Sequence, residues 1–195
     1  MSTKTRILDA ALALFNERGL GETSLRDIAD ACGISLGNLT YHFPKRDDVV
    51  MALYLQLVDR FDAIALRSPA SLHDAMLETY AAFSCYRFLS GDLLAIMRGY
   101  PAIRRHYRRL TKRREREMLD AFAGLIKGGW MRPSTTLEER RLLHLQIALQ
   151  SNFFLASAEV FHNMSEKEKQ ATFVALLSQT IRPFLTAKGK RALSP

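Results

Sequence analysis

The chain has 195 residues, of which 48% are hydrophobic and 25% are charged. This composition is typical of a folded protein and excludes a largely disordered chain, while the length suits one compact body with a small appended module. The formal net charge of +8 favours a polyanionic partner but carries no information about the fold.

Several other classes of protein are disfavoured by local patterns. The longest uncharged stretch, residues 142–158, contains histidine, glutamine, serine and asparagine, so it is too polar and too short for a membrane span. Asp9 interrupts the apolar run near the N-terminus, which argues against a signal peptide. Cys32 and Cys85 are far apart and belong to no Cys/His cluster, which argues against disulfide and zinc frameworks. We therefore expect a cytoplasmic protein without a membrane anchor.

Apolar residues recur at intervals of three and four along the chain, and neither a sustained two-residue alternation nor an Asn-Gly or Asp-Gly hairpin signal is present. This pattern predicts an all-α fold. The first helix is expected from Thr3 to Arg18, with Gly19 as a left-handed stop after it.

Two short helices are predicted next. Ser24, with an aspartate three residues later, has the spacing of a capping box that starts a helix ending at Gly33. Ser35 is placed to cap the following helix, in which Leu39 and Phe43 face inward. Two short helices joined by a tight glycine turn match the helix-turn-helix plan of proteins that read the major groove of DNA.

The outer face of this third helix carries groups suited to DNA. Asn38 can read a base edge, Tyr41 can touch a thymine methyl group or a phosphate, and Gly37 permits close approach of the backbone. Groups suited to phosphates follow at the helix end, namely His42, Lys45 and Arg46. The alternatives are that Tyr41 belongs to a local aromatic core and that Gly37 is only a weak spot costing ~1 kcal/mol relative to alanine.

A longer helix is expected to begin after Pro44 and to end near Leu66, where Ser68-Pro69 breaks it. Further helices are predicted near residues 71–89, 92–99, 102–127, 137–163 and 166–182. The expected division is a small module over 1–48, a helical body over 49–187 and a flexible tail over 188–195.

The runs ILDAALALFNERGL, TSLRDIADACGIS and GNLTYHF, the last leading into PKRDDVV, lie between about Thr5 and Leu53. In this region the chain resembles the N-terminal domain of the TetR family of transcriptional regulators. The resemblance implies an N-terminal three-helix DNA-binding domain of the helix-turn-helix type and a C-terminal helical domain that binds an effector and dimerises. It places base contacts on Arg26, Leu36, Gly37, Asn38 and Tyr41, and phosphate contacts on Ser24, Ser35, Thr40, His42 and Arg46. Thr40 replaces the family's usual tyrosine and Arg46 its usual lysine.

This resemblance implies a ligand-responsive, sequence-specific regulator, most simply a repressor, that binds double-stranded DNA at a palindromic operator. The partners implied are a second copy of the chain and an unidentified small-molecule effector. A two-fold dimer would place its two reading helices ~34–36 Å apart. No cofactor, metal or catalytic residue is implied.

The body is then expected to contain an effector pocket and a dimer face. Aromatic residues and one arginine are the candidates for the pocket lining: Tyr80, Phe83, Tyr86, Tyr100, Arg114, Phe122 and Phe153. An unpaired buried cation is costly, so Arg114 is expected to lie at the surface, to pair with an acid or to bind an anionic effector. Small and bulky residues on the last two predicted helices suit a four-helix bundle formed by two subunits: Ala148, Ser151, Ala156, Ser157, Phe173, Leu176, Leu177 and Ile181.

The positive charge lies outside the predicted DNA-binding module. Residues 1–50 carry six bases and seven acids, whereas Arg98 to Arg116 carries nine bases and one acid. This arginine-rich segment is either a solvated helix face or the source of a long-range field that attracts DNA. A rival function is a helical interaction module that binds nucleic acid or an acidic partner through this segment.

An enzyme is the other rival class. Glu159 and His162 form one Glu-x-x-His step of the kind found in di-iron bundles, but the second step that such a site needs is missing from the sequence. We therefore expect no enzymatic activity.

Overall fold

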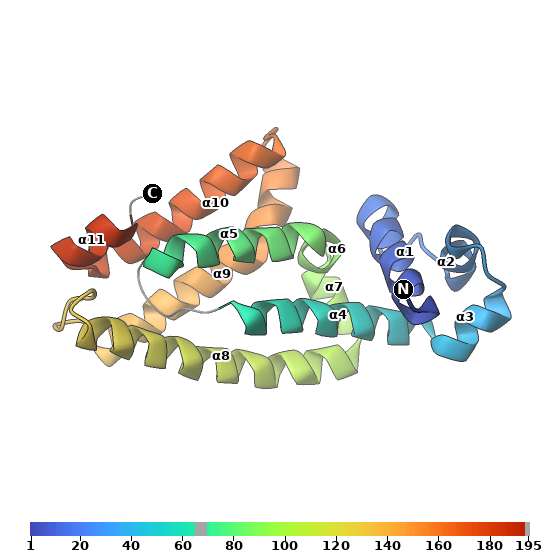
Figure 1. The fold of residues 1–195 in the computed structure, drawn as a ribbon, viewed down its shortest axis with the longest axis horizontal. Helices are drawn as coiled ribbons and strands as arrows, with labels where there is room; N and C mark the ends of the chain where they lie inside the picture. The colour runs from blue at the N-terminus through green and yellow to red at the C-terminus, as the bar shows by residue number, and fades with distance from the viewer. Residues whose placement is uncertain (65–69, 194–195) are drawn as a thin grey trace.

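In a computed structural model, which describes residues 1–64 and 70–193, the chain is built from helices (Figure 1). Among these residues the only β-type pairing is an isolated bridge between Met131 and Leu185. The predicted all-α fold is therefore confirmed. The helix bounds are α1 Thr3–Arg18, α2 Leu25–Cys32, α3 Leu36–His42, α4 Arg46–Ala63, α5 Ala70–Cys85, α6 Arg87–Gly91, α7 Leu93–Gly99, α8 Pro101–Lys127, α9 Leu137–Phe161, α10 Glu166–Ile181 and α11 Ala187–Leu193, with a 3-10 turn, η1, over Arg182–Phe184.

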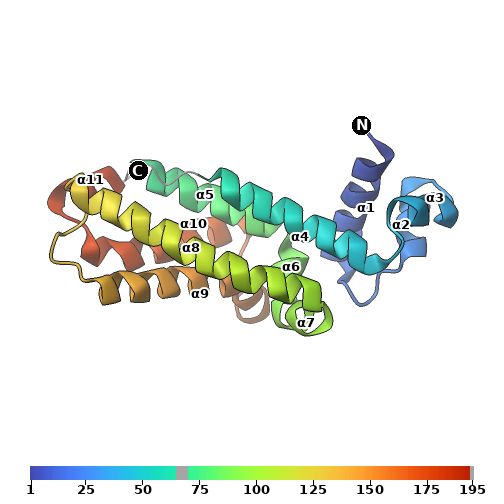
Figure 2. The same ribbon diagram turned by 90° about the horizontal axis from the view of Figure 1, so that it is seen from below.

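Helices α1 to α3 form a small unit at one end of the molecule, which we call the N-terminal module (Figures 1 and 2). The capping box of Ser24 and Asp27 starts α2, and the Ser35 hydroxyl accepts a hydrogen bond from the backbone of α3, as predicted. Gly19 ends α1 with a positive φ of 83°, but its ψ of 163° is extended and not left-handed helical. The chain therefore continues from α1 into a loop with an extended backbone at Gly19, and Leu20 in this loop is buried.

Helix α4 joins the N-terminal module to the body, which consists of α5 to α11 (Figure 2). Its first half packs into the core of the module through Val49, Val50 and Leu53. The helix ends at Ala63, a little earlier than predicted. The predicted end at Leu66 and the Ser68-Pro69 break lie outside the residues that the structure describes.

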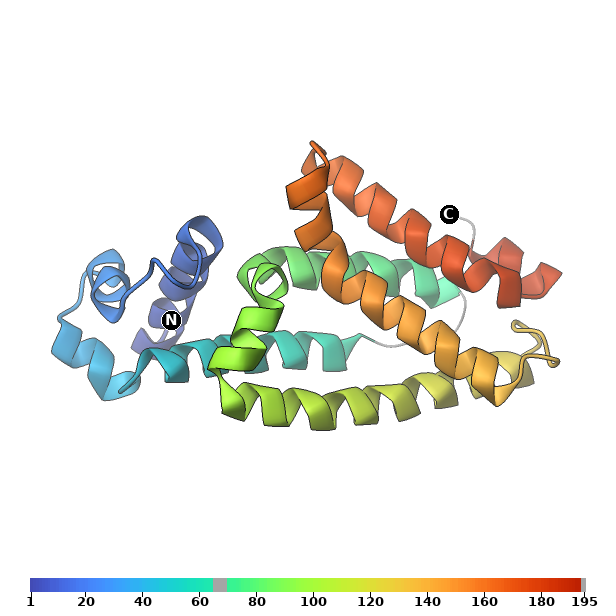
Figure 3. The same ribbon diagram turned by 180° about the vertical axis from the view of Figure 1, so that it is seen from behind.

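Helices α5, α8, α9 and α10 make up most of the body, and α9 contacts α5, α8 and α10 (Figure 3). The single helix predicted over 71–89 is interrupted at Tyr86, where α5 gives way to α6. The side chain of Asn16 in α1 stabilises this break. Its Nδ2 donates to the carbonyl of Cys85 at 2.8 Å, and its Oδ1 accepts from the backbone N–H of Phe88 at 3.1 Å. One amide thus supplies both partners that an unbroken helix would have supplied.

The flexible tail predicted over 188–195 is instead helical as far as Leu193, which is buried in the body. Helix α11 packs against the loop between α8 and α9. The Thr186 N–H donates to the carbonyl of Trp130 at 2.9 Å, and Lys188 Nζ lies 3.8 Å from the centre of the indole ring. The prediction of a flexible tail was wrong because the polar composition of the segment gives no sign of these contacts. They are made with residues that are distant in sequence.

The docking of α11 depends on Gly189. A methyl group at this position would lie 2.2 Å from the Trp130 carbonyl oxygen, so we expect Gly189→Ala to lower the free energy of unfolding by about 1–3 kcal/mol. Gly124→Ala in α8 is the matched control, since a Cβ there would meet no heavy atom within 4 Å among the described residues. It should leave stability unchanged or raise it by up to about 1 kcal/mol. Urea unfolding at fixed protein concentration measures both, and equal losses would contradict the docking of α11.

Candidate nucleic-acid interface and internal cavity

The turn between α2 and α3 is fixed by backbone geometry. Gly33 adopts the left-handed conformation, with φ of 64° and ψ of 38°. The N–H groups of Gly33 and Ile34 donate to the last carbonyls of α2, on Asp30 and Ala29, at 3.0 and 3.1 Å. The Arg6 guanidinium satisfies a further carbonyl of α2, that of Cys32, at 2.7 Å. These contacts set the direction in which α3 leaves the turn.

Helix α3 has one buried and one exposed side. Leu39 and Phe43 are buried in the core of the N-terminal module, as predicted. The opposite side carries Tyr41, which is 84% exposed and touches only the edge of the neighbouring His42 ring among the aromatic contacts of the described residues. The local-core alternative for Tyr41 is therefore not supported.

None of the eleven residues predicted to contact DNA is buried. Eight are exposed and three are half-buried: Ser24, Arg26, Ser35, Leu36, Gly37, Asn38, Tyr41 and Lys45 in the first group, and Thr40, His42 and Arg46 in the second. The hydroxyls of Ser24 and Ser35 cap α2 and α3, and Thr40 Oγ1 donates to the carbonyl of Gly37 at 3.1 Å. These three hydroxyls therefore already have partners within the module.

Arg46 also has internal partners. Its Nη1 donates to the carbonyls of Leu20 and Thr23, at 3.1 and 3.3 Å, in the loop between α1 and α2. The structure thus gives Arg46 a bracing role that the sequence did not indicate. Lys45, its neighbour, is exposed, and its backbone N–H donates to Asp48 at 2.9 Å.

Gly37 is not required by the fold. Its φ is not positive, and a Cβ built there would have Ser35 Oγ, at 3.9 Å, as its one neighbour within 4 Å among the described residues. Alanine at this helical position would be favoured by about 1 kcal/mol on intrinsic propensity. The absence of a side chain is thus a local cost that the internal packing of the module does not explain.

The body contains a cavity of about 300 Å³, which is lined by α4 and by the helices α5 to α10. Of the seven residues predicted to line a pocket, Phe83, Arg114 and Phe122 do so. The other four lie elsewhere. Tyr80 donates to Glu166 at 3.0 Å and Tyr86 to Gln56 at 3.3 Å, Tyr100 precedes α8, and Phe153 is exposed on α9. Aromatic residue type alone did not predict which residues line the cavity, since a ring can equally face a neighbouring polar group.

Most of the residues that form the cavity wall were not predicted from the sequence. Helix α4 contributes Tyr54, Leu57, Val58 and Phe61, spaced at three and four, and α9 contributes His144, Ile147, Ala148, Ser151 and Asn152 with the same periodicity. These spacings were visible in the sequence. Which partner each apolar face meets depends on tertiary packing, so the spacing alone did not reveal a cavity.

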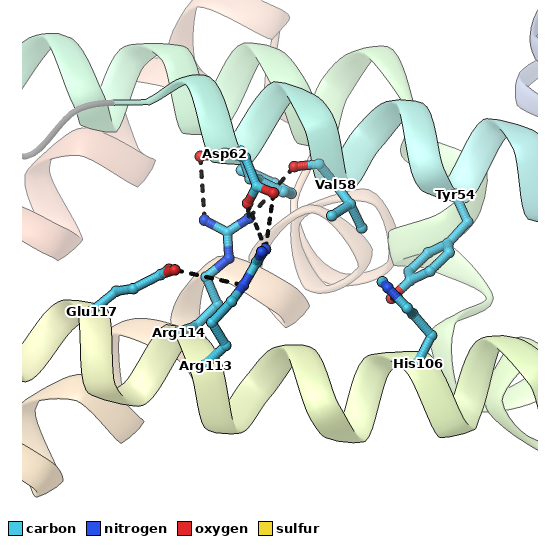
Figure 4. A network of polar contacts seen from close by, with 8 residues as sticks. Tyr54, Val58, Asp62, His106, Arg113, Arg114 and Glu117 are labelled. Atoms are coloured by element: carbon cyan, nitrogen blue, oxygen red, sulfur yellow. Dashed lines mark hydrogen bonds and ion pairs between the residues drawn. The ribbon is translucent and has the colours of Figure 1, made fainter.

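A polar network ties α4 to α8 beside this cavity (Figure 4). The Asp62 carboxylate, on the last turn of α4, accepts from Arg113 Nη2 at 2.8 and 2.9 Å and also from Arg114. Arg114 donates in addition to the carbonyls of Phe61 and Val58, at 3.2 and 3.4 Å. Of the three expectations for Arg114, pairing with an acid is confirmed.

A second contact between the same helices lies nearer the N-terminal module. The Tyr54 hydroxyl and His106 Nδ1 share a hydrogen bond of 2.9 Å, and the rings meet edge to face (Figure 4). Burial raises the pKa of Tyr54 to about 12, so the phenol is neutral at physiological pH. Helix α8 therefore holds α4 at two points along its length.

Most basic residues of the arginine-rich segment lie on the exposed side of α8: Arg104, Arg105, Arg108, Arg109, Lys112, Arg113 and Arg116. This is the arrangement of a solvated face. The start of α8 lies at the end of the body that faces the N-terminal module (Figures 1 and 2). A positive field from this helix would therefore be strongest toward that end.

The sequence also offered one Glu-x-x-His step as a candidate metal site. Glu159 and His162 are exposed at the end of α9, and the described residues contain no group of three or more His, Cys, Asp or Glu side chains placed to hold a metal ion. No helix within residues 1–64 and 70–193 is long and apolar enough to span a membrane.

Comparison with protein families decides the class. Residues 7–53 match the family described as bacterial regulatory proteins, tetR family, and residues 53–193 match a TetR family described as a bacterial transcriptional repressor. The chain belongs to the TetR family. The helix-turn-helix of α2 and α3 is thus the DNA-binding element of a TetR-family transcriptional regulator, as the resemblance implied.

Individual TetR-family relatives match over part of the chain. The chain is 37% identical over 86 residues to the transcriptional repressor KstR2 of Rhodococcus jostii, which is 40% of this chain and 42% of that protein. It is 40% identical over 58 residues to the regulator UidR of Escherichia coli, 30% of each chain. The matches thus span less than half of these relatives.

Solved structures show that the similarity of fold extends to the whole chain. A TetR-family regulator from Marinobacter aquaeolei superimposes with a TM-score of 0.86 at 24% identity, covering 99% of this chain and 96% of that one. The regulator KstR2 of Mycobacterium tuberculosis gives a TM-score of 0.64 at 20% identity, with coverage of 95% and 96%. The body therefore has the fold of a TetR-family C-terminal domain.

The different environments of two adjacent cations yield a prediction. Arg46→Ala removes two hydrogen bonds within the module, so we expect it to lower the free energy of unfolding by about 1–3 kcal/mol. Lys45→Ala removes only an exposed charge. It should change stability by less than about 0.5 kcal/mol and should reduce the slope of log affinity against log salt, measured on duplex DNA, by about 1.

Thermal unfolding of both variants reports a bracing role within the protein, and salt titrations of DNA binding report a phosphate contact. If Arg46→Ala left stability intact and changed only the salt slope, Arg46 would be a phosphate ligand and the bracing role would be wrong.

Proposed function

We propose that this TetR-family regulator is a ligand-responsive repressor that binds a palindromic operator as a homodimer. The observation that carries the DNA-reading part is the outer face of α3, where Tyr41 is almost fully exposed and Gly37 is unexplained by internal packing. A duplex lying against this face would account for both features. Asn38 and Tyr41 would then contact base edges, with Lys45 and His42 toward phosphates.

The dimer is supported by an apolar stripe on α9. Leu142, Leu145, Leu149 and Phe153 recur at three and four along the helix and are between 40% and 54% exposed, and Leu176 of α10 is similarly exposed. Helices α9 and α10 lie against each other on one side of the body (Figure 3). A stripe of this kind on two adjacent helices suits a second copy of the same pair.

Only some of the residues expected at this face lie on the surface. Leu176 and Ser157 are exposed, whereas Phe173, Leu177 and Ile181 are buried in the body. Ala148 and Ser151 line the cavity. The dimer face that we propose therefore differs from the one expected from the sequence, because it is built from apolar side chains that are exposed to water in the single chain.

Helix α4 provides the proposed route from effector to DNA. Its second half lines the cavity through Tyr54, Val58 and Phe61, and its first half lies in the core of the N-terminal module. An effector that fits the cavity better when α4 is displaced would move the module and change the spacing of the two α3 helices in the dimer. Such an effector shifts the equilibrium only by its difference in affinity for the two positions.

The DNA-reading proposal is tested by selecting a preferred duplex from random sequences with the full-length protein. Asn38→Ala and Tyr41→Ala should each weaken binding to the selected duplex by about 5-fold to 100-fold, corresponding to ~1–3 kcal/mol for a base contact. Binding to unrelated duplexes should change little. Asn163→Ala is the matched control, because it removes a side chain of the same type from an exposed site in the body. Equal losses on selected and unrelated duplexes would count against sequence reading by α3.

The dimer proposal is tested at the centre of the stripe. We expect Leu149→Glu to raise the dimer dissociation constant by at least about 100-fold, because a two-fold interface loses two leucines worth about 1.5–3 kcal/mol each. Leu94→Glu on α7, where the native leucine is 59% exposed, is the control and should leave the dimer intact. Sedimentation equilibrium measures both. A monomeric wild-type chain at all concentrations would overturn the proposal.

A further inference from the structure

We propose that the effector is an uncharged, mainly apolar molecule with a hydroxyl or carbonyl group that forms a hydrogen bond with Nδ1 of His144. This inference rests on the proposed function, because it takes the internal cavity as the effector site. It goes further in assigning the chemical class of the effector and the side chain that selects it.

The charges around the cavity argue against an ionic effector. Among the described residues that line it, Arg114 is the only one with a permanent charge. Its guanidinium is already bonded to the Asp62 carboxylate and to two carbonyls at the end of α4. With Arg113 and Glu117, which pair at 3.5 Å, this cluster holds two cations and two anions. Neither a carboxylate nor an amine would find an uncommitted counter-ion here, so burial of its charge would be costly.

Most polar groups of the wall already have partners. The Tyr54 hydroxyl bonds to His106, and the Tyr107 hydroxyl donates to Asn152 Oδ1 at 3.1 Å. The Asn152 amide donates in turn to the carbonyl of Ala148 at 2.7 Å. The hydroxyls of Thr111 and Ser90 donate to carbonyls within their own helices. These groups close the wall without needing a ligand.

His144 is different. Its Nδ1 is buried, with no surface open to the cavity, and has no hydrogen-bond partner within residues 1–64 and 70–193. A ligand in the cavity would therefore reach this nitrogen once the imidazole ring turns about its χ2 angle. An unsatisfied buried polar atom costs about 1–3 kcal/mol, which a ligand group in hydrogen-bonding position would recover. Burial lowers the pKa of His144 and outweighs the opposing effect of Glu115, so the imidazole is neutral at pH 7. A neutral imidazole nitrogen either accepts from a hydroxyl or, in the other tautomer, donates to a carbonyl.

The rest of the wall suits an apolar skeleton. His144 lies on α9 in register with Ile147, Ala148 and Ser151, which line the cavity at intervals of three and four. The facing helices contribute mainly aliphatic, aromatic and methionine side chains, including Met76, Met97 and Met118. Methionine side chains adapt to ligands of different shape. The skeleton is therefore selected loosely, and we assign recognition of the polar group to His144.

The test uses the full-length protein and four probes that share a ten-carbon chain: decan-1-ol, decan-2-one, decanoate and decylammonium. Titration calorimetry should show the alcohol and the ketone binding at least 10-fold more tightly than the two ions. His144→Leu should weaken binding of the alcohol and the ketone by about 5-fold to 10-fold, the contribution of one hydrogen bond. His162→Leu makes the same change at an exposed site and should alter nothing.

Two further measurements make the outcome decisive. The thermal midpoint of ligand-free His144→Leu should equal or exceed that of the wild type, because the variant removes an unsatisfied atom. Ser151→Phe, which fills the cavity, should abolish binding of all four probes. Equal affinity of decan-1-ol for the wild type and His144→Leu, tighter binding of decanoate, or no binding of any probe would overturn the inference. Operator binding by the ligand-free protein is measured separately, so these failures would leave the DNA-reading function standing.

Discussion

The division of α4 between two environments is the constraint on which the rest of the structure depends. Its first half completes the core of the N-terminal module, and its second half forms a wall of the internal cavity. The proposed effector response therefore depends on α4, because this helix contacts both the cavity and the core of the N-terminal module. The polar contacts of Tyr54 and Asp62 with α8 set the resting position of this helix.

The N-terminal module was predicted well from the sequence because its signals are local. Ser24, Gly33 and Ser35 fix the ends of α2 and α3 through contacts with residues at most a few positions away. The body was predicted less well because its decisive contacts join distant residues. Asn16 stabilises the break in the helix predicted over 71–89 through contacts 69 and 72 residues away in sequence. Trp130 holds in place a segment that was predicted to be a flexible tail. The bracing role of Arg46 was hidden for the same reason.

The positive charge and the residues proposed to read DNA lie in different segments of the sequence. These segments are also separate in the structure. The N-terminal module carries the groups that suit base contacts on a nearly neutral surface, whereas the positive charge lies on the exposed side of α8. A near-neutral reading surface limits affinity for arbitrary sequences, since phosphate attraction does not discriminate among them. A remote positive field accelerates encounter without favouring any particular site. Under the proposed function, the two parts of the molecule would thus contribute to different stages of DNA binding.

The amide of Asn16 has a mechanical consequence. The module is attached to the body along α4 and, separately, where this amide holds the corner between α5 and α6. The Phe15 and Phe88 rings pack beside it, with 5.2 Å between their centroids, within a core that is continuous from the module into the body. A movement of α3 relative to the body, as the proposed function requires, would therefore have to carry this corner along or break its contacts.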